Sequence, residues 1–206
     1  MDSQIHPCKI DPQLQKDIDD LNTGRITYAE FQVRQYIRQK REFMPKLLDY
    51  AAAEQWEKLI DLALSVYEIM PEAFIFYDRI PDSLKYQFAI DAYIHHGDSI
   101  PAVRRDVRNA KRYGKPTLPE EIAEAETITI YRAGEEPIEK AHNRISWTTD
   151  YSVAEFFLRE YIHRHATHLY MGTIKTKDII AYCDDRNEKE VMQYRKVFEV
   201  TDITPE

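Results

Sequence analysis

Residues 127–134, TITIYRAG, decide the fold class, because the hydrophobic pattern changes there from helical periodicity to strict alternation. β-Branched residues alternate from Thr127 to Tyr131, as expected for a strand with one buried face. Similar short stretches follow at residues 145–148, 168–174, 179–183, 191–194 and 197–203. Several short strands within one region of a chain predict a mostly antiparallel sheet.

One helix is predicted among these strands, over residues 150–162. Asp150 is a good N-cap, and Val153, Phe157 and Tyr161 recur at helical spacing. Trp147 alternates with its neighbours on the preceding strand, so we expect its side chain in the core. Residues 116–206 are therefore predicted to form a compact α+β domain with one prominent helix after its second strand.

The preceding part of the chain, residues 1–115, is predicted to be all helical. Asp11 before Pro12 predicts a helix that ends at Gly24, and Thr27 with Glu30 predicts a capping box for the next helix. Further helices are expected after Pro45, from Trp56 to Tyr67, after Pro71, after Pro81, and from Pro101 to Gly114. A hinge at residues 114–116 would separate the two domains.

The charge of the chain is uneven. The 206 residues carry a net charge of −8, and most of it falls within residues 116–206. This balance argues against broad coating by nucleic acid. One basic segment stands apart, residues 104–115, RRDVRNAKRYGK, in which a helix would align Arg104, Arg108, Lys111 and Lys115. A solvated helix face is the favoured interpretation of this segment, and a phosphate-binding surface is the alternative.

The sequence also bears on the compartment and on metals. No apolar run approaches about 18 residues, so we expect no membrane span. Residues 1–12 lack the pattern of a secretory signal, and Cys8 and Cys183 are the only cysteines, so a cytoplasmic location is expected. His163, His165 and His168 lack the spacing of a metal site, and no metal is expected.

Three segments of the C-terminal domain carry polar residues in a suggestive order. They are Tyr131–Gly134 at the end of one strand, Ser146–Thr149 on the next, and Glu188–Tyr194 leading into a later one. Here the chain resembles the mono-ADP-ribosyltransferases of the arginine, serine, glutamate class, which includes many bacterial toxins and phage enzymes. The resemblance covers about residues 126–203. It implies a split β-sandwich fold and NAD as the substrate.

Elementary chemistry agrees with the roles that the resemblance implies. Breaking the bond between nicotinamide and ribose creates an oxocarbenium-like sugar, which the Glu190 carboxylate would stabilise. Arg132 would bind the pyrophosphate, with small Ala133 and Gly134 allowing close approach of the nucleotide. Ser146 would hold the carboxylate in its working rotamer, and Thr148 would supply a second hydroxyl on the same face.

The resemblance further implies that Glu188, two residues before the catalytic glutamate, faces the acceptor. A glutamate at this position accompanies arginine as the target, and its carboxylate could take up the proton of the attacking guanidinium. The loop that carries it is Asp184-Asp185-Arg186-Asn187. The second motif reads Ser-Trp-Thr where the family has Ser-Thr-Ser, which weakens the role of Thr148.

Several alternatives stay open. The acceptor could be a nucleobase in RNA or DNA, with residues 104–115 binding phosphates. NAD could be hydrolysed without a specific acceptor. The chain could instead be a non-catalytic interaction or assembly module whose sheet is only a scaffold. The helical region could gate the site, recognise the target or bind a neutralising partner protein.

Of the aromatic residues near the site, Tyr151 could stack on nicotinamide, whereas Phe156 and Phe157 are expected to pack in the core.

Overall fold

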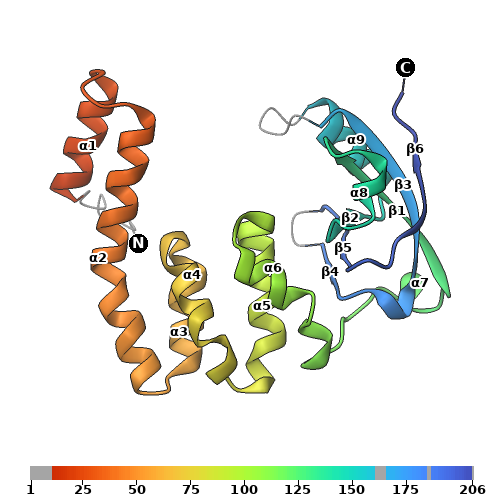
Figure 1. The fold of residues 1–206 in the computed structure, drawn as a ribbon, viewed down its shortest axis with the longest axis horizontal. Helices are drawn as coiled ribbons and strands as arrows, with labels where there is room; N and C mark the ends of the chain where they lie inside the picture. The colour runs from red at the N-terminus through yellow and green to blue at the C-terminus, as the bar shows by residue number, and fades with distance from the viewer. Residues whose placement is uncertain (1–10, 161–165, 185–186, 206) are drawn as a thin grey trace, which may run out of the picture. The chain divides into compact units, whose positions relative to one another are not determined.

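The structure is a computed structural model that describes residues 11–160, 166–184 and 187–205. Its contacts divide the chain into two compact units, Met1–Ile80 and Pro81–Glu206. The predicted boundary at residues 115/116 lies inside the second unit. Figure 1 shows helices in the first part of the chain and a sheet with helices in the last, so the predicted α+β class is confirmed.

The first unit is built from helices whose starts the sequence explains. Helix α1 (Pro12–Asn22) begins where the Asp11 carboxylate accepts hydrogen bonds from two backbone N–H groups. Helix α2 (Tyr28–Ala52) begins with the predicted capping box of Thr27 and Glu30. Helices α3 (Trp56–Ser65) and α4 (Met70–Ala73) follow, with 3-10 turns at Tyr67–Ile69 and Phe74–Arg79.

Helix α2 corrects the prediction that a new helix begins after Pro45. The helix continues through Pro45 to Ala52, although proline lacks the N–H that would bond to the preceding turn. Beyond Pro45, the side chains of Leu47 and Ala51 are buried on the same stretch of helix, and α2 packs against α3. Burial of this apolar face offsets the hydrogen bond that proline removes.

The second unit contains further helices before its first strand and between strands. They are α5 (Asp82–His96), α6 (Pro101–Val107), α7 (Glu120–Ala123) and α8 (Ile138–Ala141), with 3-10 turns at Gly97–Ser99 and Ala110–Arg112. The predicted single helix from Pro101 to Gly114 is wrong, because α6 ends at Val107. Just beyond this end, the Asn109 side chain donates a hydrogen bond to the Arg105 carbonyl oxygen (3.0 Å). The backbone N–H of Asn109 donates to the carbonyl oxygen of Asp106, three residues earlier, instead of to the residue four positions earlier. Asparagine commonly competes in this way with the helical pattern.

All six strands of the described residues belong to one antiparallel sheet. In chain order they are β1 (Thr127–Gly134), β2 (Ser146–Thr148), β3 (His168–Lys175), β4 (Ala181–Cys183), β5 (Glu190–Met192) and β6 (Phe198–Asp202). Their order across the sheet is β4-β5-β2-β1-β3-β6, with every pair antiparallel. The strands thus share one hydrogen-bonded sheet rather than two separate ones.

The predicted helix of this region is α9 (Tyr151–Arg159), between β2 and β3, and Asp150 caps it as expected. Tyr161, which the prediction placed on its apolar face, lies outside the described residues. Helix α9 contacts β1, β2 and β3, so it lies beside the centre of the sheet.

The register of β2 and β5 separates a core face from a polar face. Trp147 pairs with Val191, and both are buried in an apolar cluster with Ile130 and Tyr170. The predicted core position of Trp147 is therefore confirmed. Thr148 pairs with Glu190, so these two side chains lie on the other face.

Candidate active site

A pocket of about 570 Å³ opens in the second unit between the sheet and the end of helix α5. Its lining comes from strands β1, β2 and β5, from α9, and from the turn after α5. The pocket brings together all of the predicted site residues, which are Arg132, Ala133, Gly134, Ser146, Thr148, Glu188 and Glu190. Segments separated by up to 58 positions in the sequence thus meet in one cavity.

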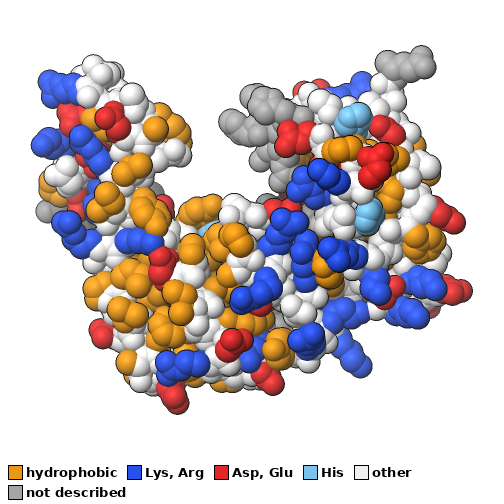
Figure 2. Space-filling model, viewed as in Figure 1, with side chains coloured by type: hydrophobic (Ala, Val, Ile, Leu, Met, Phe, Trp, Pro, Cys, Tyr) orange, Lys and Arg blue, Asp and Glu red, His pale blue; other side chains and the backbone are white. Residues whose placement is uncertain are grey.

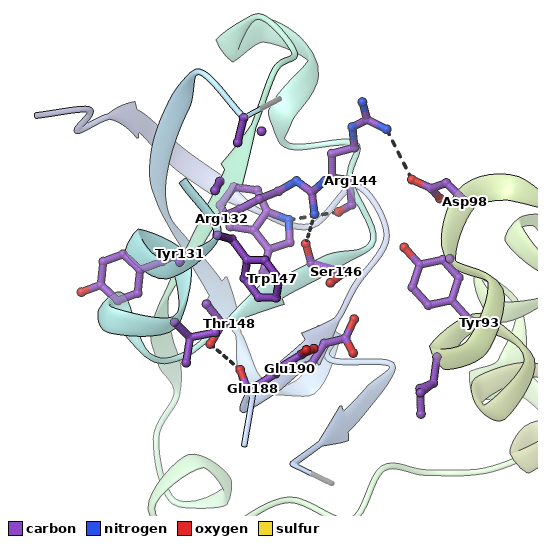
Figure 3. A pocket seen from close by; sticks show the side chains of 18 of the residues that line it. Tyr93, Asp98, Tyr131, Arg132, Arg144, Ser146, Trp147, Thr148, Glu188 and Glu190 are labelled. Carbon is purple, nitrogen blue, oxygen red and sulfur yellow. Dashed lines mark hydrogen bonds and ion pairs between the residues drawn. The ribbon is translucent and has the colours of Figure 1, made fainter. Parts of the chain in front are cut away.

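Arg132 occupies a gap between two neighbouring strands. Among the described residues of β1 and β2, Tyr131 and Thr148 are the only two that pair across the strands. Beyond this pair, the Arg132 guanidinium reaches from β1 to β2. Its Nη1 donates to the carbonyl oxygen of Ser146 at 2.6 Å, and its Nε donates to Glu136 at 3.1 Å. Arg132 is therefore held in one orientation at the edge of the pocket (Figure 3).

Glu136 joins Arg132 to a second arginine. Its side chain is only 5% exposed, and its carboxylate pairs with the Nε of Arg144 at 3.1 Å as well as with Arg132. Burial alone would raise the pKa of Glu136, but the two guanidinium charges and hydrogen bonds outweigh burial and lower it. Two cations therefore share the Glu136 carboxylate at this side of the pocket.

Gly134 makes room for this carboxylate. A Cβ at position 134 would lie 2.6 Å from Oε2 of Glu136, well inside van der Waals contact. The glycine that the sequence placed beside the nucleotide therefore also lies directly against the Glu136 carboxylate.

The turn after helix α5 forms the opposite wall. Asp98 pairs with Nη1 of Arg144 at 3.3 Å, and its other oxygen lies 3.6 Å from Nε of Arg104. Figure 3 shows Tyr93 and Asp98 entering the pocket opposite the sheet. Burial, together with the charges of Asp98 and Glu190, raises the pKa of the Tyr93 hydroxyl, which therefore stays protonated at neutral pH.

Glu190 lies at the first position of β5, and its side chain is almost fully buried. Its pairing with Thr148 fixes its place along the sheet. The Thr148 hydroxyl donates to the carbonyl oxygen of Glu188 at 2.6 Å and accepts from the backbone N–H of Asp150 at 3.0 Å. Thr148 therefore ties the start of α9 to the segment that carries both glutamates.

Lys189 reinforces the same connection from between the two glutamates. Its ammonium pairs with Asp150 at 2.9 Å, and its carbonyl accepts from the N–H of Thr149 at 3.1 Å. Its backbone φ is positive, at 46°, which marks a tight turn immediately before β5. Glu188 and Glu190, on either side of this turn, both line the pocket.

The roles assigned to Ser146 and to the acidic loop stay predictions. Within the described residues, the Ser146 hydroxyl makes no hydrogen bond to Glu190, and Ser146 meets Arg132 through its carbonyl. Asp185 and Arg186 of the predicted acceptor loop lie outside the described residues.

Sequence reasoning missed several charged or polar groups of the pocket, among them Tyr93, Asp98, Glu136 and Arg144. Two of them carried a signal, because Glu136 follows Arg132 by four positions and Arg144 precedes Ser146 by two. Tyr93 and Asp98 lie in the region assigned to the helical domain, where no motif marks them. The expected core position of Phe156 is wrong, because that side chain is 52% exposed, whereas Phe157 lines the pocket.

Metal ligands and membrane spans were searched for in the described part of the chain. There, no three histidine, cysteine or carboxylate side chains gather as a metal site would require. His168 lies beside Asp202, with Nδ1 and Oδ2 at 2.8 Å, while His163 and His165 lie outside the described residues. No described helix combines the length and apolar character needed to cross a membrane.

Comparison of the chain with protein-family models, with curated proteins and with solved structures finds no match.

Proposed function

We propose that this protein transfers ADP-ribose from NAD to an acceptor, with an arginine side chain of a target protein as the preferred acceptor. The observation that carries the proposal is the convergence of Arg132, Ser146 and Glu190 on one pocket. The ADP-ribosyltransferase type of fold is part of the same proposal. The single antiparallel sheet, whose strands β1, β2 and β5 all contribute residues to the pocket, supports it.

The two sides of the pocket suit different parts of NAD. Arg132 and Arg144 offer planar cations to the diphosphate, which would compete with Glu136 for them. The Glu190 carboxylate would stabilise positive charge on the ribose as the glycosidic bond to nicotinamide breaks. Nicotinamide leaves with the bonding electron pair as a neutral molecule.

Glu188 would serve the acceptor. A guanidinium nitrogen of the target arginine forms the new bond to the ribose carbon and gives up a proton, which the Glu188 carboxylate accepts. The hydrogen bond from Thr148 to the Glu188 carbonyl holds this residue at the pocket.

The decisive experiment compares wild type with Glu190→Gln, using NAD labelled in its adenylate part and a cell lysate. Loss of the carboxylate is expected to reduce transfer by about 10³-fold, the range seen when a group that stabilises transition-state charge is removed. The matched control is Glu139→Gln, an exposed glutamate of α8 that does not line the pocket. Thermal melting of each variant checks that the fold is intact.

The acceptor is identified by digestion of the labelled product. Label that depends on Glu190 and disappears with protease supports transfer to protein, and Glu188→Gln should then abolish transfer while nicotinamide release continues. If wild type and Glu190→Gln alike give neither label nor nicotinamide, the proposal is wrong and the sheet is an interaction scaffold.

A further inference from the structure

A second concave surface of the same unit lies away from the candidate active site and is lined by lysines. This pocket, of about 590 Å³, receives Lys111 and Lys115 from the segment after α6, and Lys175 and Lys177 from the end of β3. Among the described residues of its lining, Glu126 is the one that is acidic. Four cations facing one carboxylate make this pocket strongly positive, in a chain whose net charge is −8.

The lysines are available to a ligand. Lys115, Lys175 and Lys177 are exposed, and within the described residues none of them forms an ion pair. The Lys111 ammonium donates to the Lys177 carbonyl, which holds the two basic segments together. Pro116 and Leu118 add apolar surface to the same pocket.

The basic surface continues toward the candidate active site. The guanidinium of Arg108 lies over the ring of Tyr194, 4.2 Å from its centroid, and that of Arg195 lies 5.2 Å from the same ring. Burial and the neighbouring charge of Arg104 lower the pKa of Arg108, as expected where cations crowd together. Arg104 in turn reaches Asp98 on the rim of the candidate active site.

We call these cations together the basic strip, and Figure 2 shows Lys and Arg side chains gathered over this part of the second unit. The strip consists of Arg104, Arg108, Lys111, Lys115, Lys175, Lys177 and Arg195. It differs from the single helical stripe expected from the sequence, because α6 ends at Val107 and three chain segments contribute.

We propose that the basic strip binds single-stranded nucleic acid. Spaced cations beside exposed apolar surface suit a strand whose phosphates follow the charges and whose unpaired bases contact that surface. The apolar part of the lysine-lined pocket supplies such surface. A duplex would keep its bases paired and could use only the charges.

This binding goes beyond the proposed transfer reaction and does not depend on it. Because the strip ends at Arg104, beside Asp98, a bound strand would extend to the edge of the candidate active site.

The test measures fluorescence anisotropy of a labelled oligothymidylate of about 20 nucleotides, titrated with the full chain at several salt concentrations. The test variant replaces three strip lysines, Lys115→Gln, Lys175→Gln and Lys177→Gln. The control replaces three exposed lysines of the first unit, Lys16→Gln, Lys46→Gln and Lys58→Gln, and changes the net charge equally. A single-strand contact contributes about 0.7 to the slope of log K against log salt.

The strip variant should therefore bind about 100-fold more weakly at 0.1 M salt, with a slope reduced by about 2, while the control matches wild type. Glu190→Gln should also bind as wild type does, which separates this inference from the proposed function. Equal losses in the strip variant and the control would overturn the proposal. So would an absence of wild-type binding at low salt, or tighter binding to a duplex of the same length.

Discussion

The two sides of the candidate active site hold their charged groups by different means. On the β1 side, Arg132 and Arg144 are oriented by ion pairs with the buried carboxylate of Glu136. On the β5 side, Glu190 is placed by strand register, and the turn before it by hydrogen bonds to Thr148 and the main chain. Ion pairs can be exchanged for a ligand's charges, whereas strand register cannot. The first side is therefore suited to binding an anion and the second to holding a reactive group still.

On the β1 side, the largest effect is expected from removing the Glu136 carboxylate that the two arginines share. Glu136→Gln should destabilise the protein by about 3 kcal/mol, because two partly buried guanidinium groups lose their anion. Urea unfolding measures the change, with exposed Glu135→Gln as the control. ADP should bind more tightly to the variant, since the site gains positive charge; weaker binding would contradict the view that Glu136 competes with phosphate.

The stability difference between wild type and Glu136→Gln should also depend on pH. Because the pKa of Glu136 is lowered in the folded protein, its stabilising effect is full above the unfolded pKa of about 4.3 and is lost as pH falls through the lower folded value. The difference in unfolding free energy between wild type and Glu136→Gln should therefore shrink below about pH 4. A difference that stays constant to pH 2 would show that the carboxylate is not paired.

Changing the shape of the first cation should have a smaller effect. Arg132→Lys keeps the charge, but one ammonium cannot both reach the Ser146 carbonyl and pair with Glu136 as the guanidinium does. We expect kcat/KM for NAD to fall by about 30-fold, roughly 2 kcal/mol, mainly through KM. Arg112→Lys, at an exposed position, is the matched control. An unchanged KM would remove Arg132 from the NAD site.

The β5 side can be tested with an isosteric change at Thr148. Thr148→Val removes the hydroxyl that joins the Glu188 carbonyl to the N–H of Asp150. The unfolding free energy should fall by about 1.5 kcal/mol, because two partly buried polar groups lose their partner. Thr129→Val on exposed β1 surface should be nearly neutral. Transfer should decrease as well, and equal stability of the two variants would argue against the proposed anchoring.

The smallest expected effect is at the cap of α9. Asp150→Ala should cost about 1 kcal/mol through loss of the N-cap and of the pair with Lys189. Hydrogen bonds from Ser152, then from Lys189, lower the pKa of Asp150 to about 2, so this stability is present above about pH 4 and is lost as pH falls toward 2. Thermal melting at pH 7 and pH 2 measures it, with Asp61→Ala in α3 as the control; equal losses at both pH values would contradict this account.

Sequence reasoning succeeded where a local pattern has a local cause. The caps at Asp11, Thr27 and Asp150 and the alternation of β1 are fixed by neighbours within a few positions, and the structure has them. It failed at Pro45, where the burial of Leu47 and Ala51 overrides a helix-breaking residue.

The candidate site shows the same division. Arg132, Ser146 and Glu190 could be named because each belongs to a short motif in strand context, and all three line the pocket. Tyr93 and Asp98 could not, because they come from a distant helix and turn that meet the sheet only in three dimensions. The basic strip was visible in part, as residues 104–115, but Lys175 and Lys177 join it only through the fold.

The close approach of Gly134 to Glu136 has a consequence for sequence variation. The backbone at Gly134 needs no positive φ, so alanine is allowed there by conformation alone. Its methyl group would instead push away the carboxylate that two arginines share. Gly134→Ala introduces no charge, but it would change the electrostatics of the site by displacing the Glu136 carboxylate. In a mutational scan, the effects of Gly134→Ala should therefore resemble those of the charge-altering variants of Glu136 more than those of other exchanges between small residues.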